Sequence, residues 1–171
     1  MVDRPSTHLA ALIPELIVAY ALDATDLKIL RALMADGRIT NVALAAKVGL
    51  SGPPCLRRMR ALEQAGIITG YHAEADVAAL GFTVTAFVGV ALHNQTEADL
   101  RAFEERVLTW PQVREAYMMS GETDYHLKCL TRDLTTFQSF LVKSVSAAPN
   151  VAGVKAQVAM RRAKFEPGVP V

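Results

Sequence analysis

The stretch LSGPPCLRRMRALEQAGIITGY, residues 50 to 71, combines two adjacent prolines and three arginines with the pattern of a short buried helix. Ser51 is a favourable N-cap, and the two prolines follow at early helical positions, where a missing backbone N–H costs little. Three apolar residues recur at helical spacing and are expected to be buried: Leu56, Met59 and Leu62. Three arginines lie opposite this stripe or beside it: Arg57, Arg58 and Arg60. The segment therefore predicts a helix that packs one face on a neighbour and presents a cationic face outward.

Two further helices are predicted before this one. The first runs from Asp23 to Ala35, with Asp23 as N-cap and Asp26 three residues on, the spacing of a capping box. The second follows Thr40 and ends at Gly49, with apolar residues at helical spacing: Val42, Leu44, Ala45 and Val48. Two short helices joined by a tight glycine-containing turn, the second basic at its start, are typical of a helix-turn-helix. After Gly66 we expect a short strand or wing and then a linker.

The second half of the chain alternates between the two periodicities. Strands are predicted at 82–92, 113–120, 123–131 and 154–162, and helices at 97–110 and 134–148. The order βαββαβ is that of a ferredoxin-like domain. The first strand is apolar at successive positions, so both of its faces are expected to be covered, one of them by a partner subunit.

Charge is distributed unevenly along the chain. Residues 21–72 carry seven Lys and Arg against four Asp and Glu, whereas the residues from Ala73 onward carry ten against eleven. A positive excess confined to one half predicts a module that binds a polyanion and a second module that does not. In the context of the helix-turn-helix pattern, the polyanion is expected to be double-stranded DNA.

These observations divide the chain into five parts. They are an N-terminal extension (1–21), a helix-turn-helix DNA-binding domain (22–72), a linker (73–81), a ferredoxin-like effector-binding and oligomerisation domain (82–164) and a C-terminal tail (165–171). The apolar run near the N-terminus is interrupted by Pro14 and Glu15 and is too short to span a bilayer, so no membrane partner is expected. The two cysteines, 74 residues apart, form neither a ligand pair nor a disulfide framework. We expect a reducing cytoplasm and no cofactor or metal.

Four sequence motifs resemble the Lrp/AsnC, or feast/famine, family of transcriptional regulators. These are LDATDLKIL at the start of the first helix, DGRI at Asp36–Ile39, VGLS followed by a proline and two arginines, and GETDY at Gly121–Tyr125. The resemblance runs from about Leu22 to Arg162. It implies an α+β protein with an N-terminal winged helix-turn-helix domain followed by a βαββαβ ferredoxin-like domain of the RAM type.

The resemblance also implies a DNA-binding surface. Its predicted residues are Arg38, Lys47, Ser51, Pro54, Arg57, Arg58 and Arg60. The chain departs from the family pattern at Gly52 and Pro53, where a proline and then a small hydroxyl residue usually follow the serine. A base or phosphate contact from that hydroxyl is therefore missing here.

For the second domain, the resemblance implies dimers that pair through the sheet, larger rings such as octamers, and an amino acid effector bound between dimers. The predicted effector-binding residues are Met118, Gly121, Glu122, Thr123, Asp124, Leu134, Gln157, Val158 and Ala159. Backbone N–H groups near Gly121 suit a carboxylate, and Asp124 suits an ammonium group. Gln157 and Leu134 would set side-chain preference. The alternative is that Gly121 only makes a turn and Asp124 caps it.

The sequence fits two other classes of protein less well. The four histidines are scattered, and no HExxH, CxxC, GxGxxG or GxxxxGK motif is present, so an enzyme is not expected. Asp124 and His126 share a strand face, but a surface hydrogen bond explains that spacing better than acid-base catalysis. A stand-alone ligand sensor or adaptor without DNA binding remains the alternative function, and the basic helix argues against it.

Overall fold

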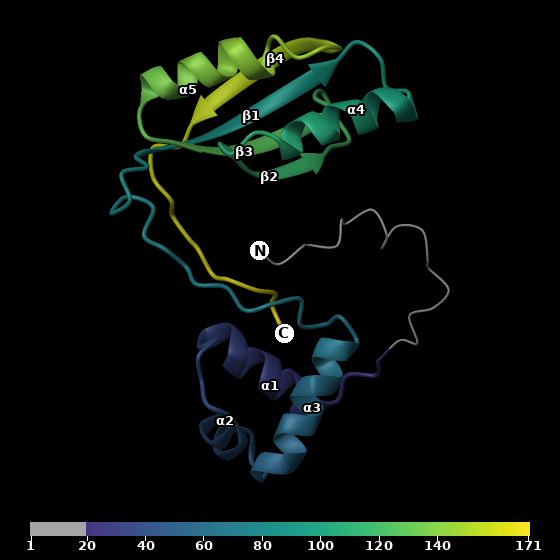
Figure 1. The fold of residues 1–171 in the computed structure, drawn as a ribbon, viewed down its shortest axis with the longest axis vertical. Coiled ribbons are helices and arrows are strands. Elements are labelled where there is room, and N and C mark those ends of the chain that lie inside the picture. The colour runs from purple at the N-terminus through teal and green to yellow at the C-terminus, as the bar shows by residue number, and fades with distance from the viewer. Residues whose placement is uncertain (1–19) are drawn as a thin grey trace. The chain divides into compact units, whose positions relative to one another are not determined.

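The computed structural model describes residues 20–171 of the chain. The predicted extension, residues 1–21, lies almost wholly outside the described residues. The described chain forms two compact units. One comprises the residues up to Ala73 together with Phe165–Val171, and the other is Glu74–Lys164. Each unit is considered by itself below, and Figure 1 labels their helices and strands.

The first unit contains three helices. They are α1 (Ala24–Ala35), α2 (Asn41–Val48) and α3 (Gly52–Gln64), as the sequence pattern predicts. Asp23 and Asp26 form the predicted capping box at the start of α1, and the Thr40 hydroxyl caps α2. Gly49 ends α2 with φ of 75°, a left-handed conformation that glycine adopts without steric cost. The turn between α2 and α3 therefore forms at Gly49, as the sequence predicted.

The core of this unit differs in detail from the expected apolar stripe. In α3 the fully buried side chains are Cys55 and Leu62, whereas Leu56 and Met59 are only half-buried. Val42 is exposed on α2. Cys55 is small enough to sit where three helices meet, and burial raises the pKa of its thiol.

The expected strand after Gly66 is not present. Between α3 and the first strand of the second unit, at Val84, the described chain has turns and irregular structure. Ile67 and Ile68 instead donate their backbone N–H groups to the Leu62 carbonyl and pack against the three-helix core. The two isoleucines are therefore apolar because they pack on the helical core after α3, not because they pair in a sheet.

The second unit has the predicted βαββαβ order. Its elements are β1 (Val84–Leu92), α4 (Glu97–Leu108), β2 (Val113–Met118), β3 (Tyr125–Thr131), α5 (Leu134–Phe140) with a π-helical turn at Leu141–Val145, and β4 (Val151–Val158). The four strands form one antiparallel sheet in the order β2-β3-β1-β4. Both helices cover the same face of this sheet (Figure 1). The arrangement is ferredoxin-like, with β1 in the interior of the sheet.

One face of the sheet is buried and the other is open. Even-numbered residues of β1, from Val84 to Leu92, pack with Phe103 and Val107 of α4 and with Phe137 and Phe140 at α5. On the opposite face, Phe87 is 45% exposed and Tyr117 is 56% exposed. Within a single chain, the expected covering of both faces of β1 is thus met on one face only.

The last strand is displaced from its predicted limits. β4 begins at Val151, pairs along β1 and ends at Val158, whereas residues 154–162 were expected. Its pairing ends where β1 begins, and Met160 beyond it is almost fully exposed. No helix among residues 20–171 is both long and apolar enough to cross a bilayer.

Candidate nucleic-acid interface and effector site

Helix α3 presents an exposed polar stripe on the side away from its buried residues. Its polar members are Arg57, Arg60 and Gln64, with Pro53 at the start of the same stripe and the exposed Glu63, which accepts from the Tyr71 hydroxyl, beside it. Among the described residues, no carboxylate pairs with the guanidinium of Arg57 or Arg60. A helix with two unpaired guanidinium groups on one face has the donors that phosphates and guanine edges accept from.

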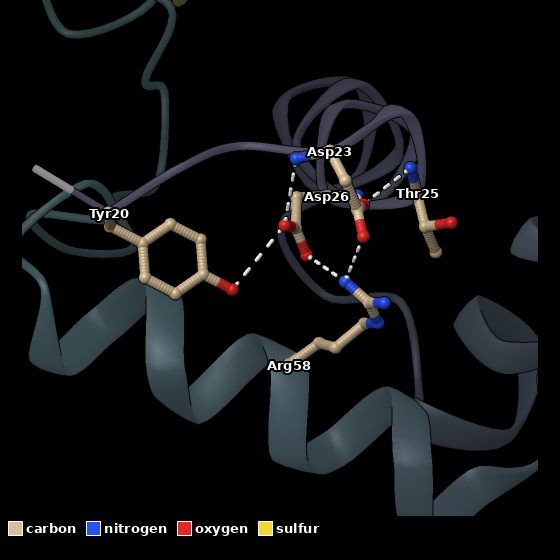
Figure 2. Close-up of polar contacts among 5 residues, drawn as sticks. All are labelled: Tyr20, Asp23, Thr25, Asp26 and Arg58. Atoms are coloured by element: carbon tan, nitrogen blue, oxygen red, sulfur yellow. Dashed lines mark hydrogen bonds and ion pairs between the residues drawn. The ribbon is translucent and has the colours of Figure 1, made fainter.

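Arg58 lies on a different side of α3 and is engaged within the domain. Its Nη1 donates to Asp23 Oδ2 at 2.7 Å and to Asp26 Oδ1 at 2.9 Å (Figure 2). The side chain is 35% exposed, and the Asp26 side chain it faces is 2% exposed. These contacts, with Asp26 first and Asp23 second, raise the pKa of Arg58. Arg58 thus makes internal contacts in this structure, and its predicted contact with DNA stays a prediction.

The other predicted DNA contacts lie around the helix-turn-helix. Arg38 is exposed in the turn after α1, and Ser51 is the exposed N-cap of α3, with a side chain that makes no capping hydrogen bond. Pro54 is half-buried in the first turn of α3. Lys47 lies in the last turn of α2 and lines a hollow of about 220 Å³ together with Lys28, Arg31, Ala32 and Val48. A cation near a helix C-terminus also complements the helix dipole, so Lys47 has a structural role besides the predicted one.

Asn41 was missed by the sequence analysis. As the first residue of α2, it donates from Nδ2 to the carbonyl of Gly52 at 3.1 Å. A Cβ at Gly52 would lie 3.5 Å from that nitrogen, an ordinary contact. The amide thus ties the start of α2 to the start of α3. Asparagine at the first helical position was the only sequence signal, and it does not reveal the partner.

The nine predicted effector residues fall into two groups within one chain. Met118 pairs with Tyr125, and residues 121–124 form the β2–β3 turn near Val90. The second group lies toward the other end of β1: Leu134, Gln157, Val158 and Ala159. Val158 is opposite Ala86, four residues along β1 from Val90, which is roughly 13 Å at 3.3 Å per residue. Within one chain the two groups are therefore separated along the sheet, although Glu122 of the turn reaches Lys155, two residues before Gln157.

Asp124 is held by the end of β1 and the loop that follows. Its Oδ2 accepts from the Leu92 backbone N–H at 2.7 Å, and its Oδ1 accepts from Gln95 Nε2 at 2.7 Å. His126 is exposed and is not its partner. Each carboxylate oxygen keeps a second lone pair, so the group can still accept from an ammonium ion. These contacts are structural, but they go to the end of β1 and the following loop and not to the Gly121 turn that Asp124 would cap in the alternative.

Glu122 in the same turn pairs with Lys155 of β4 at 2.7 Å. The Lys155 ammonium lowers the pKa of the Glu122 carboxyl. Thr123 lies against Gly89 of β1, where a Cβ would come within 3.1 Å of the threonine methyl group. The turn is thus tied to two different strands.

Comparison with known proteins assigns both units. Residues 22–69 match the model of a winged helix-turn-helix DNA-binding domain, and residues 85–169 match that of the Lrp/AsnC ligand binding domain. The chain is 49% identical to the leucine-responsive regulatory protein of Rhizobium meliloti over 149 residues, which is 87% of this chain and 96% of the relative. The chain belongs to the Lrp/AsnC family. The resemblance of the sequence motifs is thereby confirmed.

Further Lrp/AsnC relatives support the same assignment. The Bkd operon transcriptional regulator of Pseudomonas aeruginosa is 43% identical over 88% of this chain and 98% of its own length. A crystal structure of a transcriptional regulator from Neisseria meningitidis in complex with L-Met aligns with a TM-score of 0.84 at 33% identity, covering 88% of this chain and 97% of that one. Since these relatives are regulators, this Lrp/AsnC member is a DNA-binding transcriptional regulator and not an enzyme.

Proposed function

We propose that this regulator reads duplex DNA with α3 in the major groove and that an amino acid, bound between subunits, modulates the binding. The observation that carries the first part is the exposed stripe of α3, in which Arg57 and Arg60 have no acidic partner among the described residues. Guanidinium groups can bind guanine O6 and N7 in bidentate fashion or contact phosphates. Ser51 and Arg38 are exposed, and we propose that they contact the DNA phosphate backbone beside Arg57 and Arg60.

Two copies of α3 in a symmetric dimer would read half-sites about one helical turn apart, roughly 34 Å. Changing Arg57 and Arg60 to Ala together is expected to weaken duplex binding strongly at physiological salt, because base and phosphate contacts are both lost. Thermal stability should stay near wild type, since both side chains are exposed. The measurement is an electrophoretic shift or fluorescence titration over a range of salt concentrations.

A matched control is Arg101→Ala, which removes an exposed arginine from α4 of the other unit, where its partner is Glu97. DNA affinity should not change in that variant. Unchanged affinity in the Arg57→Ala, Arg60→Ala protein would contradict the assignment of α3 as the recognition helix. The DNA contacts would then lie elsewhere in the protein. The alternative of a sensor without DNA binding would be favoured only if wild type itself bound no duplex.

The effector proposal rests on the division of the predicted residues between two ends of the sheet. The Gly121–Asp124 turn of one subunit and the segment with Leu134 and Gln157 of another would together enclose a small ligand. The complex of the Neisseria meningitidis regulator with L-Met makes an amino acid the chemical class to test first. The turn would supply N–H groups for the ligand carboxylate, and Asp124 would accept from its ammonium group.

A thermal-shift screen of the twenty amino acids tests this proposal. A ligand at one hundred times its dissociation constant stabilises a folded protein by about 2.7 kcal/mol, enough to raise the melting temperature by several degrees. Asp124→Ala is an ambiguous control because it also removes contacts to Leu92 and Gln95. Gln157→Leu and Leu134→Ala are better controls for this screen, since both residues are exposed and the fold should survive their replacement. Absence of any stabilising amino acid would contradict an amino acid effector.

We further propose the assembly, the domain limits and the compartment of this regulator. The chain forms a dimer through the open sheet face, and dimers assemble into a larger ring such as an octamer. The working boundaries are residues 22–72 for DNA binding and 82–164 for effector binding and assembly. The regulator acts in the cytoplasm, where the DNA is.

A further inference from the structure

The start of α1 and the middle of α3 are joined by one network of charges. Asp23 Oδ1 accepts from the backbone N–H groups of Thr25 and Asp26, both at 2.8 Å, while its Oδ2 accepts from Arg58. Asp26 Oδ1 accepts from Arg58, and Oδ2 accepts from the Asp23 backbone N–H at 3.2 Å and from the Tyr20 hydroxyl at 3.4 Å. Figure 2 shows these contacts converging between the two helices. All four carboxylate oxygens are therefore used.

A single guanidinium nitrogen of Arg58 bonds both carboxylates, so the capping box of α1 and the side chain of α3 cannot move independently. The Asp26 side chain is 2% exposed, and a buried carboxylate requires a nearby cation or donor. Arg58 is that cation. Its displacement toward a DNA phosphate would leave Asp26 buried without its counterion.

The position of Arg58 on the helix links this network to the exposed stripe. At 3.6 residues per turn, Arg58 lies about 100° from Arg57 and about 160° from Arg60 around the axis of α3. A rotation of α3 by about 20° would displace atoms at its surface, at a radius of about 5–6 Å, by roughly 2 Å. A shift of that size breaks a hydrogen bond to a base edge. Fixing Arg58 thus fixes the direction of the other two arginines.

We propose that Arg58 is a positioning residue for DNA recognition. It is held by Asp23 and Asp26, sets the rotation of α3 on α1, and contributes to sequence discrimination without touching DNA. The inference rests on the proposed role of α3 as the recognition helix. It separates three neighbouring arginines into two that contact the nucleic acid and one that aligns them.

The salt dependence of binding distinguishes positioning from contact. Each phosphate contact adds about 0.9 to the slope of log affinity against log salt concentration. The full chain is titrated with a random-sequence duplex and with a duplex enriched by selection on the wild-type protein. Arg57→Ala is expected to reduce the slope by about 0.9 for each recognition helix bound. Arg58→Met is expected to leave the slope unchanged and to reduce the ratio of selected to random affinity at least tenfold.

The double variant Asp26→Asn, Arg58→Met provides the rescue. It removes the stranded buried charge, and the asparagine oxygen can still accept from the Asp23 backbone N–H. If Arg58 acts by positioning, the double variant should recover melting temperature and part of the affinity ratio relative to Arg58→Met, with the wild-type slope. If Arg58→Met does not fold, the test uses the double variant alone, whose slope of log affinity against log salt concentration should equal that of wild type.

Three results would overturn the proposal. One is a slope reduced by Arg58→Met, or by the double variant, as much as by Arg57→Ala, which would make Arg58 a phosphate contact. Another is an affinity ratio that Arg58→Met leaves at the wild-type value. The third is a double variant that regains stability and none of the ratio. Failure of the recognition-helix assignment is separate, because it appears as an unchanged duplex affinity in the Arg57→Ala, Arg60→Ala protein.

Discussion

At the scale of single residues, charge by itself does not distinguish a ligand contact from a structural contact. Arg58 and Asp124 were both predicted to bind something outside the chain, and each bonds groups of its own unit. The partners of Arg58 lie 35 and 32 residues away in the sequence, and the Leu92 N–H lies 32 residues from Asp124. Helical and strand periodicity predicts which face of its own element a side chain lies on. Periodicity does not predict which other element that side chain will contact.

Acid should weaken the Asp23 network. Hydrogen bonding from the Asp26 backbone N–H, together with Arg58, lowers the pKa of Asp23 below its ordinary value. A carboxyl with a lowered folded-state pKa stabilises the fold fully above its unfolded pKa of about 3.9, and this contribution is lost as the pH falls through the folded-state value. We therefore expect Asp23→Asn to melt below wild type at pH 7 and the gap to narrow below pH 4. A gap that stays constant between pH 7 and pH 2 would contradict this assignment.

At the scale of elements, residue type and spacing correctly predicted the helix ends that depend on contacts within a few residues. The N-caps Asp23 and Thr40 and the glycine after α2 were identified from residue type and spacing, because their hydrogen bonds and backbone angles are made within a few residues. The βαββαβ order followed from the change of period. Where a short strand or wing was expected after Gly66, no strand forms, since two adjacent isoleucines suit a strand and a core contact equally well.

Element limits and the site itself depend on contacts that spacing does not contain. β4 begins and ends where β1 offers backbone groups to pair with, so its limits are set by a partner that lies 59 to 72 residues earlier in the sequence. The exposed stripe of α3 could be predicted from the wheel for Arg57 and Arg60. The Asn41 bond to Gly52 could not, because many residues can begin a helix and only the packed α2–α3 pair brings the two atoms together.

At the scale of the whole molecule, the uncovered face of the sheet is the feature that most needs a partner. Aromatic side chains from two strands lie exposed on it, Phe87 of β1 and Tyr117 of β2, and both belong to the face that carries no helix. The cross-strand neighbours of Phe87 are Lys128 and Gln157, so the face is mixed and not wholly apolar. A second copy of the same face would cover the aromatic rings and leave the polar groups paired.

Dimerisation through this face predicts a specific response to one substitution. Wild type is expected to be a dimer or larger at micromolar concentration, measured by light scattering after size exclusion, and Phe87→Asp to be smaller because a buried carboxylate would face the partner's sheet. Leu108→Asp is the matched control, since Leu108 is 84% exposed at the end of α4, away from the open face. Its size should match wild type. If both variants keep the wild-type mass, or if wild type is itself a monomer, the open face is not the dimer interface, and a pocket assembled from two subunits would lose its structural basis.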